Sequence, residues 1–289
     1  MNVLRGMPTN LGSLLYRDLW TMKMPMLLIS GTLSASGSFE HLKKKTGLSL
    51  VPDERLIETS KPSPFDYKNN ALLYISENVP FPDNADPAYI GAVVSETEKL
   101  ITAANGHTVV LFTSYRAMSQ VFERIKALNL PYPIYRLERG STSGLEQFKQ
   151  SQNGVLFASG AFWEGVDIPG DKLSLLIIVR LPFAVPDVLS EWEKTLYSDI
   201  NEYKEKVVTP DMLIKFKQGS GRVLRLETDT GVIALFDSRA SKHGTYRKQV
   251  LESLPPCQVT SKIKDVCKFM KINKPPAYFD LESDALTVL

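Results

Sequence analysis

Short apolar runs alternate with amphipathic stretches along most of this chain. Runs of this length, rich in Val, Ile, Leu and Phe, are typical of strands buried on both faces of a parallel sheet, and the intervening stretches have helical periodicity. Strands are predicted at Met26–Ser30, Ala71–Ser76, Thr108–Thr113, Ile134–Leu137, Val155–Ser159, Leu173–Val179 and Val232–Phe236. Helices are predicted at Pro87–Ala104, Tyr115–Leu128, Gly144–Gln150, Asp187–Tyr203, Pro210–Phe216 and Ser241–Leu254.

This alternation predicts a doubly wound α/β fold with a mostly parallel sheet covered by helices on both faces. The segment after Pro255 is polar and Lys-rich, so residues 255–289 are expected to form a tail that packs on this domain or trails from it. In such folds ligands bind at the carboxyl ends of the strands. Candidate functional residues should therefore follow strands directly.

Composition adds little to the fold but limits the function. The 289 residues are 43% hydrophobic and 23% charged, which is typical of a globular protein. Net charge is +2, with 34 Lys and Arg against 32 Asp and Glu, so any nucleic-acid site must be local. The stretch Asp211–Lys248 holds eight basic residues against four acids and is the most basic part identified.

Membrane and metal sites are not expected. The apolar runs are far too short to cross a bilayer, and the first residues lack the apolar core of a signal peptide, so we predict a cytoplasmic protein without a membrane partner. Only Cys257 and Cys267 occur, without a His-rich neighbourhood, so this chain alone offers no zinc or iron–sulfur ligand set.

Two post-strand loops carry small hydroxyl side chains. Ser30-Gly31-Thr32 could expose backbone N–H groups to a phosphate or a neighbouring domain, with a plain helix cap or turn as the alternative. Thr113-Ser114-Tyr115 could hold a nucleic-acid backbone, with a helix N-cap at Thr113 or Ser114 as the alternative.

A third loop, which begins after Ser159, combines glycines, aromatics and two acids. It reads Gly160-Ala-Phe-Trp-Glu164-Gly165-Val-Asp167-Ile-Pro-Gly170. Gly160 and Gly165 have the GxxxxG spacing of a phosphate-binding loop, but Val and Asp167 follow where that loop needs Lys and Ser or Thr. The loop is therefore not a Walker A motif, and its acids need solvent or partners. A glycine-rich turn that binds no ligand is the alternative.

The fourth segment is Gln218-Gly219-Ser220-Gly221-Arg222-Val223-Leu224-Arg225. If the chain is helical here, Arg222 and Arg225 lie on one face, with Gln218 one turn earlier. Converging guanidiniums bind phosphate, and glycines beside them indicate close approach of another group. A solvated surface pair is the alternative.

These four segments, in this order, resemble the motifs of the second motor domain of superfamily 2 helicases, most closely the DinG branch of the XPD/DinG group. Ser30–Thr32 resembles motif III, Phe112–Tyr115 motif IV, Gly160–Gly170 motif V and Gln218–Arg225 motif VI. The resemblance covers roughly residues 11–254 and implies a RecA-like three-layer domain. Gly31 replaces an alanine of motif III, a mild departure.

The resemblance implies a role for each candidate residue. Arg225 would be the arginine finger, Arg222 a second phosphate contact and Gln218 a polar contact in the same cleft. Glu164, Gly165, Asp167 and Gly221 would lie on the ATP side. The single-stranded DNA track would include Thr113, Ser114, Tyr115, Ser159 and Gly160, while Ser30, Gly31 and Thr32 would couple the two sites.

The half that holds ATP and Mg²⁺ in such motors is missing here. No GxxxxGK[ST] and no Asp-Glu-x-His occur, so we expect a fragment or a natural half whose first motor domain is absent from this chain, and no ATP hydrolysis by the chain alone. A rival interpretation is a nucleotide-independent module that binds single-stranded nucleic acid. An α/β hydrolase is disfavoured because Gly140-Ser-Thr-Ser-Gly144 has Thr142 where the nucleophile should be.

Overall fold

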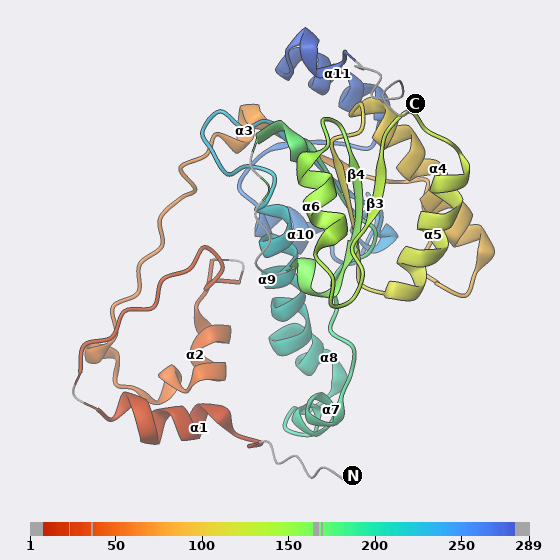
Figure 1. The fold of residues 1–289 in the computed structure, drawn as a ribbon. Helices are drawn as coiled ribbons and strands as arrows, with labels where there is room; N and C mark the ends of the chain where they lie inside the picture. The colour runs from red at the N-terminus through yellow and green to blue at the C-terminus, as the bar shows by residue number, and fades with distance from the viewer. Residues whose placement is uncertain (1–7, 23, 36, 164–167, 169, 281–289) are drawn as a thin grey trace. The chain divides into compact units, whose positions relative to one another are not determined.

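The computed structural model describes residues 8–22, 24–35, 37–163, 168 and 170–280. The chain divides into two compact units, of which unit 1 comprises residues 1–62 and 182–218 and unit 2 comprises residues 63–181 and 219–289. Figure 1 shows the elements of both, and each unit is described separately below.

Unit 2 is built on a seven-stranded sheet in the order β3-β4-β2-β5-β6-β1-β7, and all its strand pairs are parallel. The strands are β1 (Ala71–Ile75), β2 (Thr108–Phe112), β3 (Ile134–Arg136), β4 (Val155–Ser159), β5 (Leu175–Ile178), β6 (Gly231–Leu235) and β7 (Gln258–Thr260). Every residue of β1, β2, β4, β5 and β6 is buried, because helices cover both faces of the central strands.

Most helices of unit 2 connect these parallel strands, while α3 precedes β1 and α11 follows β7. They are α3 (Tyr67–Asn70), α4 (Pro87–Ala103), α5 (Tyr115–Ala127), α6 (Ser143–Gln150), α10 (Arg247–Ser253) and α11 (Ile263–Asn273), with short 3-10 turns η4 (Gly160–Trp163), η5 (Gly170–Leu173), η7 (Ser238–Ala240) and η8 (Pro276–Tyr278). The start of α4 shows why helices begin where they do: the Asp86 carboxylate accepts from the Ala88 N–H at 2.8 Å, and Pro87 occupies the first turn.

Successive side chains of each strand point to opposite faces of the sheet, so both faces carry part of the apolar core. Leu72 and Tyr74 of β1 and Val110 and Phe112 of β2 join one apolar cluster with the inner faces of α4, α5 and α11. The residues between them, such as Leu111, are also fully buried and point to the opposite face.

The segment after Pro255 is tied into unit 2. Its strand β7 pairs with β1 at the edge of the sheet, and α11 packs on α4. Tyr278 stacks on His107 with 4.0 Å between ring centroids and donates its hydroxyl to the Ala104 carbonyl at 2.8 Å. The Lys274 ammonium lies 2.6 Å from the Asp171 carboxylate, with its side chain 1% exposed. These contacts anchor residues 258–278.

Unit 1 consists of short helices. They are α1 (Leu11–Leu15), the π-helical turn η1 (Tyr16–Trp20), α2 (Glu40–Thr46), the 3-10 turns η2 (Leu48–Leu50) and η3 (Asp53–Arg55), α7 (Val188–Lys194), α8 (Ile200–Tyr203) and the π-helical turn η6 (Lys204–Val208), followed by α9 (Thr209–Ser220), which reaches the unit boundary after Gln218. The α1 and α2 backbones approach closely, because a Cβ at Gly47 would lie 2.0 Å from the Gly12 carbonyl oxygen. Gly47 also has φ of +77°, so glycine is required there on both counts.

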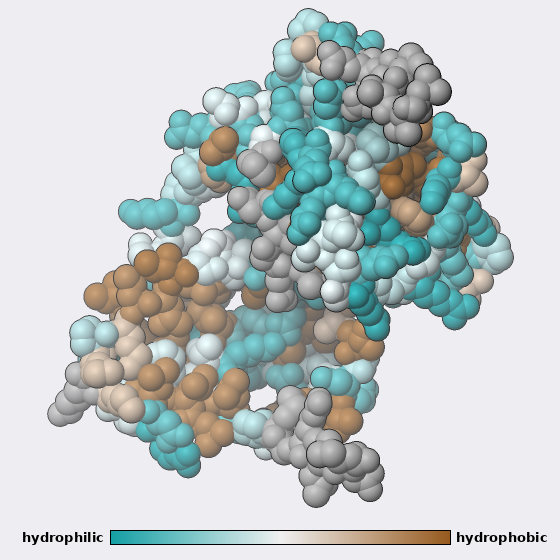
Figure 2. All heavy atoms as spheres, in the orientation of Figure 1, coloured by the Kyte–Doolittle hydropathy of each residue, from teal (hydrophilic) through white to brown (hydrophobic). Residues whose placement is uncertain are grey.

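The fold class predicted from the sequence is confirmed, and strands β1 to β6 lie within a residue or two of their predicted bounds. The predicted strand Met26–Ser30 is wrong: residues 24–30 form no strand, and Leu27 and Ile29 are 82% and 81% exposed. A strand requires a neighbour for its backbone groups, and the described residues supply none. Figure 2 shows apolar side chains gathered over the N-terminal segment that Figure 1 draws in red and orange.

Several helix bounds also differ from the prediction. The helix predicted over Asp187–Tyr203 is two helices, because Asp199 caps α8 by accepting from the Asn201 and Glu202 N–H groups. The helix predicted over Ser241–Leu254 begins only at Arg247. The helix predicted over Pro210–Phe216 runs from Thr209 to Ser220, and β7, α1, α2 and α11 were not predicted.

Candidate functional site

The carboxyl ends of β2 and β4 bring two of the candidate loops together. Phe112 pairs with Ser159 in the sheet, so the loops that follow start side by side. The Tyr115 hydroxyl donates to the Ser159 carbonyl at 3.4 Å, and the Arg139 guanidinium lies 4.3 Å from the Tyr115 ring centroid. Gly160 has φ of +65°, and a Cβ there would lie 2.9 Å from the Tyr115 hydroxyl. Motif IV and motif V residues are therefore in direct contact.

The hydroxyls of motif IV have different local roles. The Ser114 hydroxyl accepts from the Ala117 N–H at 3.4 Å and is the N-cap of α5, which confirms the capping alternative for this residue. Thr113 and Tyr115 are half-buried beside it. Ser159 is only 1% exposed, so neither its hydroxyl nor its backbone is accessible to solvent in the described conformation.

Trp163 connects motif V to both motif IV and motif VI. Its indole N–H donates to the Phe112 carbonyl at 3.0 Å, and its own carbonyl accepts from the Arg222 guanidinium at 2.7 Å. A Cβ at Gly219 would lie 2.9 Å from the Trp163 ring. The group that approaches the glycine of motif VI is therefore a side chain of this protein. Sequence reasoning did not single out Trp163, although a tryptophan in a glycine-rich loop was a visible signal.

The two arginines of motif VI do not share a helical face. Helix α9 ends at Ser220, so the chain is not helical at Arg222 and Arg225, and the condition under which they would share one helical face is not met. Arg222 is 6% exposed, with its guanidinium 5.5 Å from the Phe162 ring centroid. Arg225 is exposed, and its backbone N–H donates to the Asp229 carboxylate at 2.8 Å, as does the N–H of Leu226. The turn is held by Asp229 while the Arg225 side chain reaches the surface.

Motif III meets motif VI within unit 1. Ser30, Gly31 and Thr32 lie in a turn in which the Ser30 hydroxyl accepts from the Thr32 N–H at 3.2 Å. The Gln218 side-chain amide donates to the Thr32 hydroxyl at 3.2 Å. Two segments almost two hundred residues apart in sequence are thus joined by a side-chain hydrogen bond. Gly221 is half-buried in the turn after α9, whereas Glu164, Gly165 and Asp167 lie outside the described residues.

A buried carboxylate fixes the loops after β5 and β6. Asp237 follows β6 and is fully buried, and its carboxylate accepts from the Leu181 N–H at 2.9 Å. Arg239 donates to both carboxylate oxygens, at 2.8 and 2.6 Å. Such a bidentate pair offsets the cost of burying the charge. Sequence reasoning missed this pair, although an acid directly after a strand with an arginine two residues later was the available signal.

The described residues contain no group of three or more His, Cys, Asp or Glu side chains arranged to hold a metal ion. In the same part of the chain, no helix has the length and apolar character that a membrane span requires. Arg139 lies beside Tyr115 after β3, Arg222 and Arg225 precede β6, and Arg239 is paired with the buried Asp237 carboxylate. Arg139 and Arg225 are exposed, so their guanidiniums are accessible to an anion.

A parallel sheet with helices on both faces and candidate loops at its carboxyl edge is the RecA-like fold of helicase motor domains. An apo structure of XPD matches with a TM-score of 0.51 and 21% identity over 67% of this chain and 40% of that one. A second XPD helicase structure matches with a TM-score of 0.50 and 20% identity over 66% and 36%. At these identities the likeness establishes the fold.

Sequence comparison gives the family. Residues 97–257, more than half of the chain, match the helicase C-terminal domain, and the chain belongs to that family. It is 34% identical to the ATP-dependent DNA helicase YoaA of Escherichia coli over 85% of this chain and 38% of that protein. It is 33% identical to the ATP-dependent helicase DinG of Mycobacterium tuberculosis over 91% and 39%. The predicted resemblance to a DinG-type C-terminal helicase domain is confirmed.

A third relative has a different activity in its name. The 3'-5' exonuclease DinG of Bacillus subtilis is 32% identical over 88% of this chain and 28% of that protein. The chain therefore spans less than two-fifths of the length of these three relatives.

Proposed function

We propose that this chain is the second motor domain of an ATP-dependent DNA helicase of DinG type, and that it supplies the arginine finger and half of the single-stranded DNA track. Family membership and the helicase names of its relatives support the proposal. The observation that carries it is the anchoring of motif VI. Arg222 is held against Trp163 of motif V, Asp229 holds the backbone at Arg225, and the Arg225 side chain is exposed.

An exposed arginine on a turn that other residues hold in place is the arrangement that an arginine finger requires. A finger supplied from a second domain stabilises charge on the transferred phosphoryl group and can be worth about 10³–10⁵ in rate, provided that it is positioned accurately. We assign that role to Arg225. The buried Arg222 then holds the turn, and the half-buried Gln218 connects it to Thr32. Gly221 lies between them and contributes its backbone. Glu164, Gly165 and Asp167 complete the ATP side in this proposal.

The single-stranded DNA track would run along the ends of β2 and β4, over Thr113, Ser114, Tyr115, Ser159 and Gly160. Hydroxyl and backbone donors contact phosphates without reading base sequence, and an aromatic ring can stack on any base. The Tyr115 ring with the Arg139 guanidinium 4.3 Å from its centroid provides both a flat surface and a positive charge. A motor that steps along arbitrary sequences needs this kind of contact.

The proposal requires a first motor domain that carries the Walker A and B motifs and holds ATP with Mg²⁺. Residues 11–254 would then be the second motor domain, and residues 255–289 its C-terminal extension. The exposed segment 24–30 is consistent with such a partner, because Leu27 and Ile29 have the character of a strand without a sheet. We infer that this segment adds a strand to the first motor domain, where Ser30, Gly31 and Thr32 couple the ATP and DNA sites. A cytoplasmic location is part of this proposal.

ATP hydrolysis stimulated by single-stranded DNA tests the proposal. We would compare this chain with a longer protein that also carries the first motor domain, each with Arg225→Ala and with Arg124→Ala as a matched control on the exposed end of α5. Turnover is expected only in the longer protein, with a loss of about 10³-fold or more for Arg225→Ala and little change for Arg124→Ala.

The rival function is a nucleotide-independent module that binds single strands. It predicts binding with a steep salt dependence and no response to ATP in either protein. If the longer protein binds DNA but does not hydrolyse ATP, or if Arg225→Ala leaves turnover unchanged, the motor proposal fails.

A further inference from the structure

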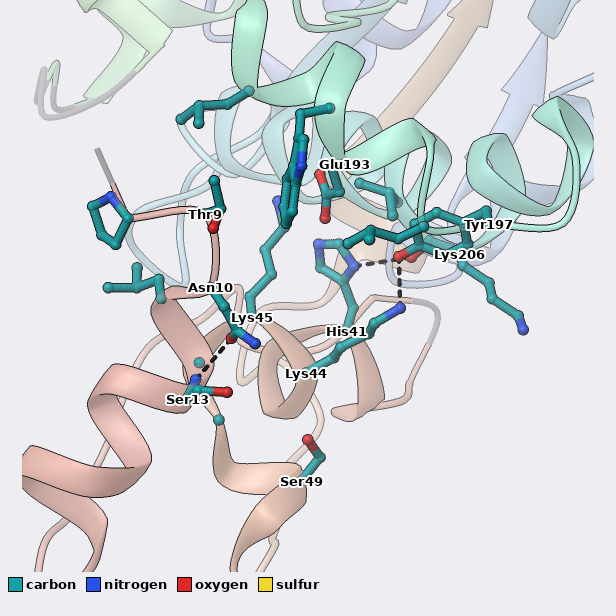
Figure 3. A pocket seen from close by; sticks show the side chains of 18 of the residues that line it. Thr9, Asn10, Ser13, His41, Lys44, Lys45, Ser49, Glu193, Tyr197 and Lys206 are labelled. Carbon is teal, nitrogen blue, oxygen red and sulfur yellow. Dashed lines mark hydrogen bonds between the residues drawn. The ribbon is translucent and has the colours of Figure 1, made fainter. Parts of the chain in front are cut away.

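Unit 1 contains a cavity of about 500 Å³ that none of the helicase motifs accounts for. It is lined by α1 and its N-cap, by α2, by α7 and by the segment from Leu196 to Val207. Its volume lies within the range of about 300–1,000 Å³ that is usual for ligand pockets. Figure 3 shows that its polar side chains come from chain segments far apart in sequence.

Lys44 and Tyr197 form a cationic pair in the wall of this cavity. The Lys44 ammonium donates to the Tyr197 hydroxyl at 2.6 Å and lies 4.3 Å from the centroid of the Tyr197 ring (Figure 3). The ammonium keeps two further N–H donors, and the hydroxyl, which accepts from Lys44, keeps its own proton to donate. Two adjacent donors, one of them charged, are suited to an anionic oxygen.

The other cations of the cavity are neutralised, but Lys44 is not. Lys45 pairs with Asp211 at 2.5 Å, and Lys206 pairs with Glu202 at 2.7 Å. Among the described residues no carboxylate lies within ion-pair distance of Lys44. Lys44 is therefore the lysine of this lining without an ion pair among the described residues, and the Glu193 carboxylate, which also lines the cavity, likewise has none there.

His41 and Asp211 hold the helix that presents Lys44. His41 Nε2 lies 2.7 Å from the Asp211 carboxylate and Nδ1 lies 3.2 Å from the Lys206 carbonyl oxygen. Because both partners accept hydrogen bonds, the ring donates to both when it is protonated. Although burial raises the pKa of Asp211, hydrogen bonds from His41 and Lys45 outweigh it and lower that pKa. These contacts fix α2 against the η6 and α9 segments, so the Lys44–Tyr197 pair is preorganised.

Trp192 of α7 adds an aromatic face to the lining. It is 38% exposed, whereas Trp20 and Trp163 are 9% and 2% exposed. A flat indole surface beside a cation and hydroxyl donors is the combination that binds single-stranded nucleic acid, in which a base stacks and the phosphate is held by charge. A paired base cannot reach such a surface, because it is stacked within the duplex.

We propose that this cavity binds one nucleotide unit of single-stranded DNA, with the phosphate on Lys44 and Tyr197 and the base on Trp192. The inference rests on the proposed function, since that function supplies the DNA strand. It adds a contact in unit 1 that the motif residues do not provide. Thr9, Asn10 and Ser49 line the same cavity and offer uncharged polar groups to the base and sugar.

The experiment uses the full 289-residue chain and a 20-nucleotide oligothymidylate labelled with fluorescein, with anisotropy and tryptophan fluorescence as readouts. Lys44→Met is expected to weaken binding about tenfold and to reduce the slope of log K against log salt by about 0.7, the value for one phosphate contact. Tyr197→Phe keeps the ring but removes the hydroxyl that donates to the phosphate, so it should also weaken binding. Trp192→Leu should weaken it about 5- to 100-fold and abolish the DNA-induced quenching of tryptophan fluorescence.

Lys268→Met is the matched control, because it removes the same charge from an exposed position on α11 in unit 2. A duplex of the same length is the ligand control and should cause no quenching. Equal effects of Lys44→Met and Lys268→Met, equal quenching by the duplex, or no binding of the oligothymidylate would overturn the proposal.

The cavity proposal and the motor proposal can fail independently of each other. ATP hydrolysis by the longer protein depends on Arg225, whereas oligothymidylate binding by this chain depends on Lys44 and Trp192. Loss of turnover in Arg225→Ala together with unchanged binding in Lys44→Met would refute the cavity site alone. The reverse pattern would refute the motor assignment and leave the cavity site in place.

Discussion

The contact between Gly219 and Trp163 gives a quantitative test of how motifs V and VI are joined. In Gly219→Ala the new Cβ would lie 2.9 and 3.1 Å from two carbon atoms of the Trp163 ring. Ordinary contacts of a Cβ begin at about 3.4 Å, so the ring or α9 must move by several tenths of an ångström. The ring cannot yield easily, because it is 2% exposed and its N–H is bonded to the Phe112 carbonyl.

Overpacking of this kind costs about 1–3 kcal/mol. The substitution also brings a favourable term, since alanine is preferred to glycine in a helix by up to about 1 kcal/mol. Gly91 in α4 allows the two terms to be separated, because a Cβ there meets no atom within 4 Å. Gly91→Ala should therefore stabilise the protein slightly, and Gly219→Ala should be less stable than Gly91→Ala by about 1–3 kcal/mol.

Urea denaturation followed by circular dichroism would measure both variants, with the slope m checked against the unaltered chain because two units need not unfold together. Tryptophan emission would report the displacement of Trp163 in the folded state. If Gly219→Ala equals or exceeds Gly91→Ala in stability, the contact does not constrain motif VI and the reasoning is wrong.

Three further predictions concern Gly160, Arg222 and His107. Gly160→Ala should destabilise by about 1–2 kcal/mol, because the residue has φ of +65° and faces the Tyr115 hydroxyl; an unchanged melting temperature would contradict this. Arg222→Met should cost about 1.5–3 kcal/mol in urea denaturation by removing the hydrogen bond to the Trp163 carbonyl, whereas Arg225→Ala should cost much less because the side chain is exposed. Burial lowers the pKa of His107 to about 4, whereas the unfolded chain binds a proton at this histidine near pH 6.5. Between these pH values the proton favours the unfolded chain, so the free energy of unfolding should fall by about 3 kcal/mol as the pH drops from 6.5 to 4. His107→Asn, which suits the positive φ of 41°, should remove this component, and an identical pH profile for the variant would refute it.

The central strands could be predicted because short, mostly apolar runs are typical of strands that helices cover on both faces. β1, β2, β4, β5 and β6 are buried throughout, and each was visible as a short run of mostly apolar residues. β7 was missed because Gln258, Val259 and Thr260 are partly exposed at the sheet edge and are not a continuous apolar run. The segment 26–30 failed for the opposite reason, since it has the composition of a strand but pairs with no described strand.

The sequence predicted which residues belong to the site better than it predicted how they are arranged. The motif residues could be recognised from their types and spacing, and Tyr115 with Ser159, and Gln218 with Thr32, are indeed brought together. The inward turn of Arg222 could not be predicted, because it depends on the end of α9 at Ser220 and on a carbonyl group of Trp163, fifty-nine residues away in sequence. Hydrogen bonds to backbone carbonyls leave no mark on the side-chain pattern.

The order of strands in the sheet has a consequence for synthesis of the chain. The neighbours of β1 are β6 and β7, and β6 begins only at Gly231. At about 5–20 residues per second, the ribosome needs roughly 8–30 seconds after β1 before β6 has been made. During that interval Ala71–Ile75 is an apolar strand without its partners, so early chaperone binding at β1 would protect the nascent chain from aggregation.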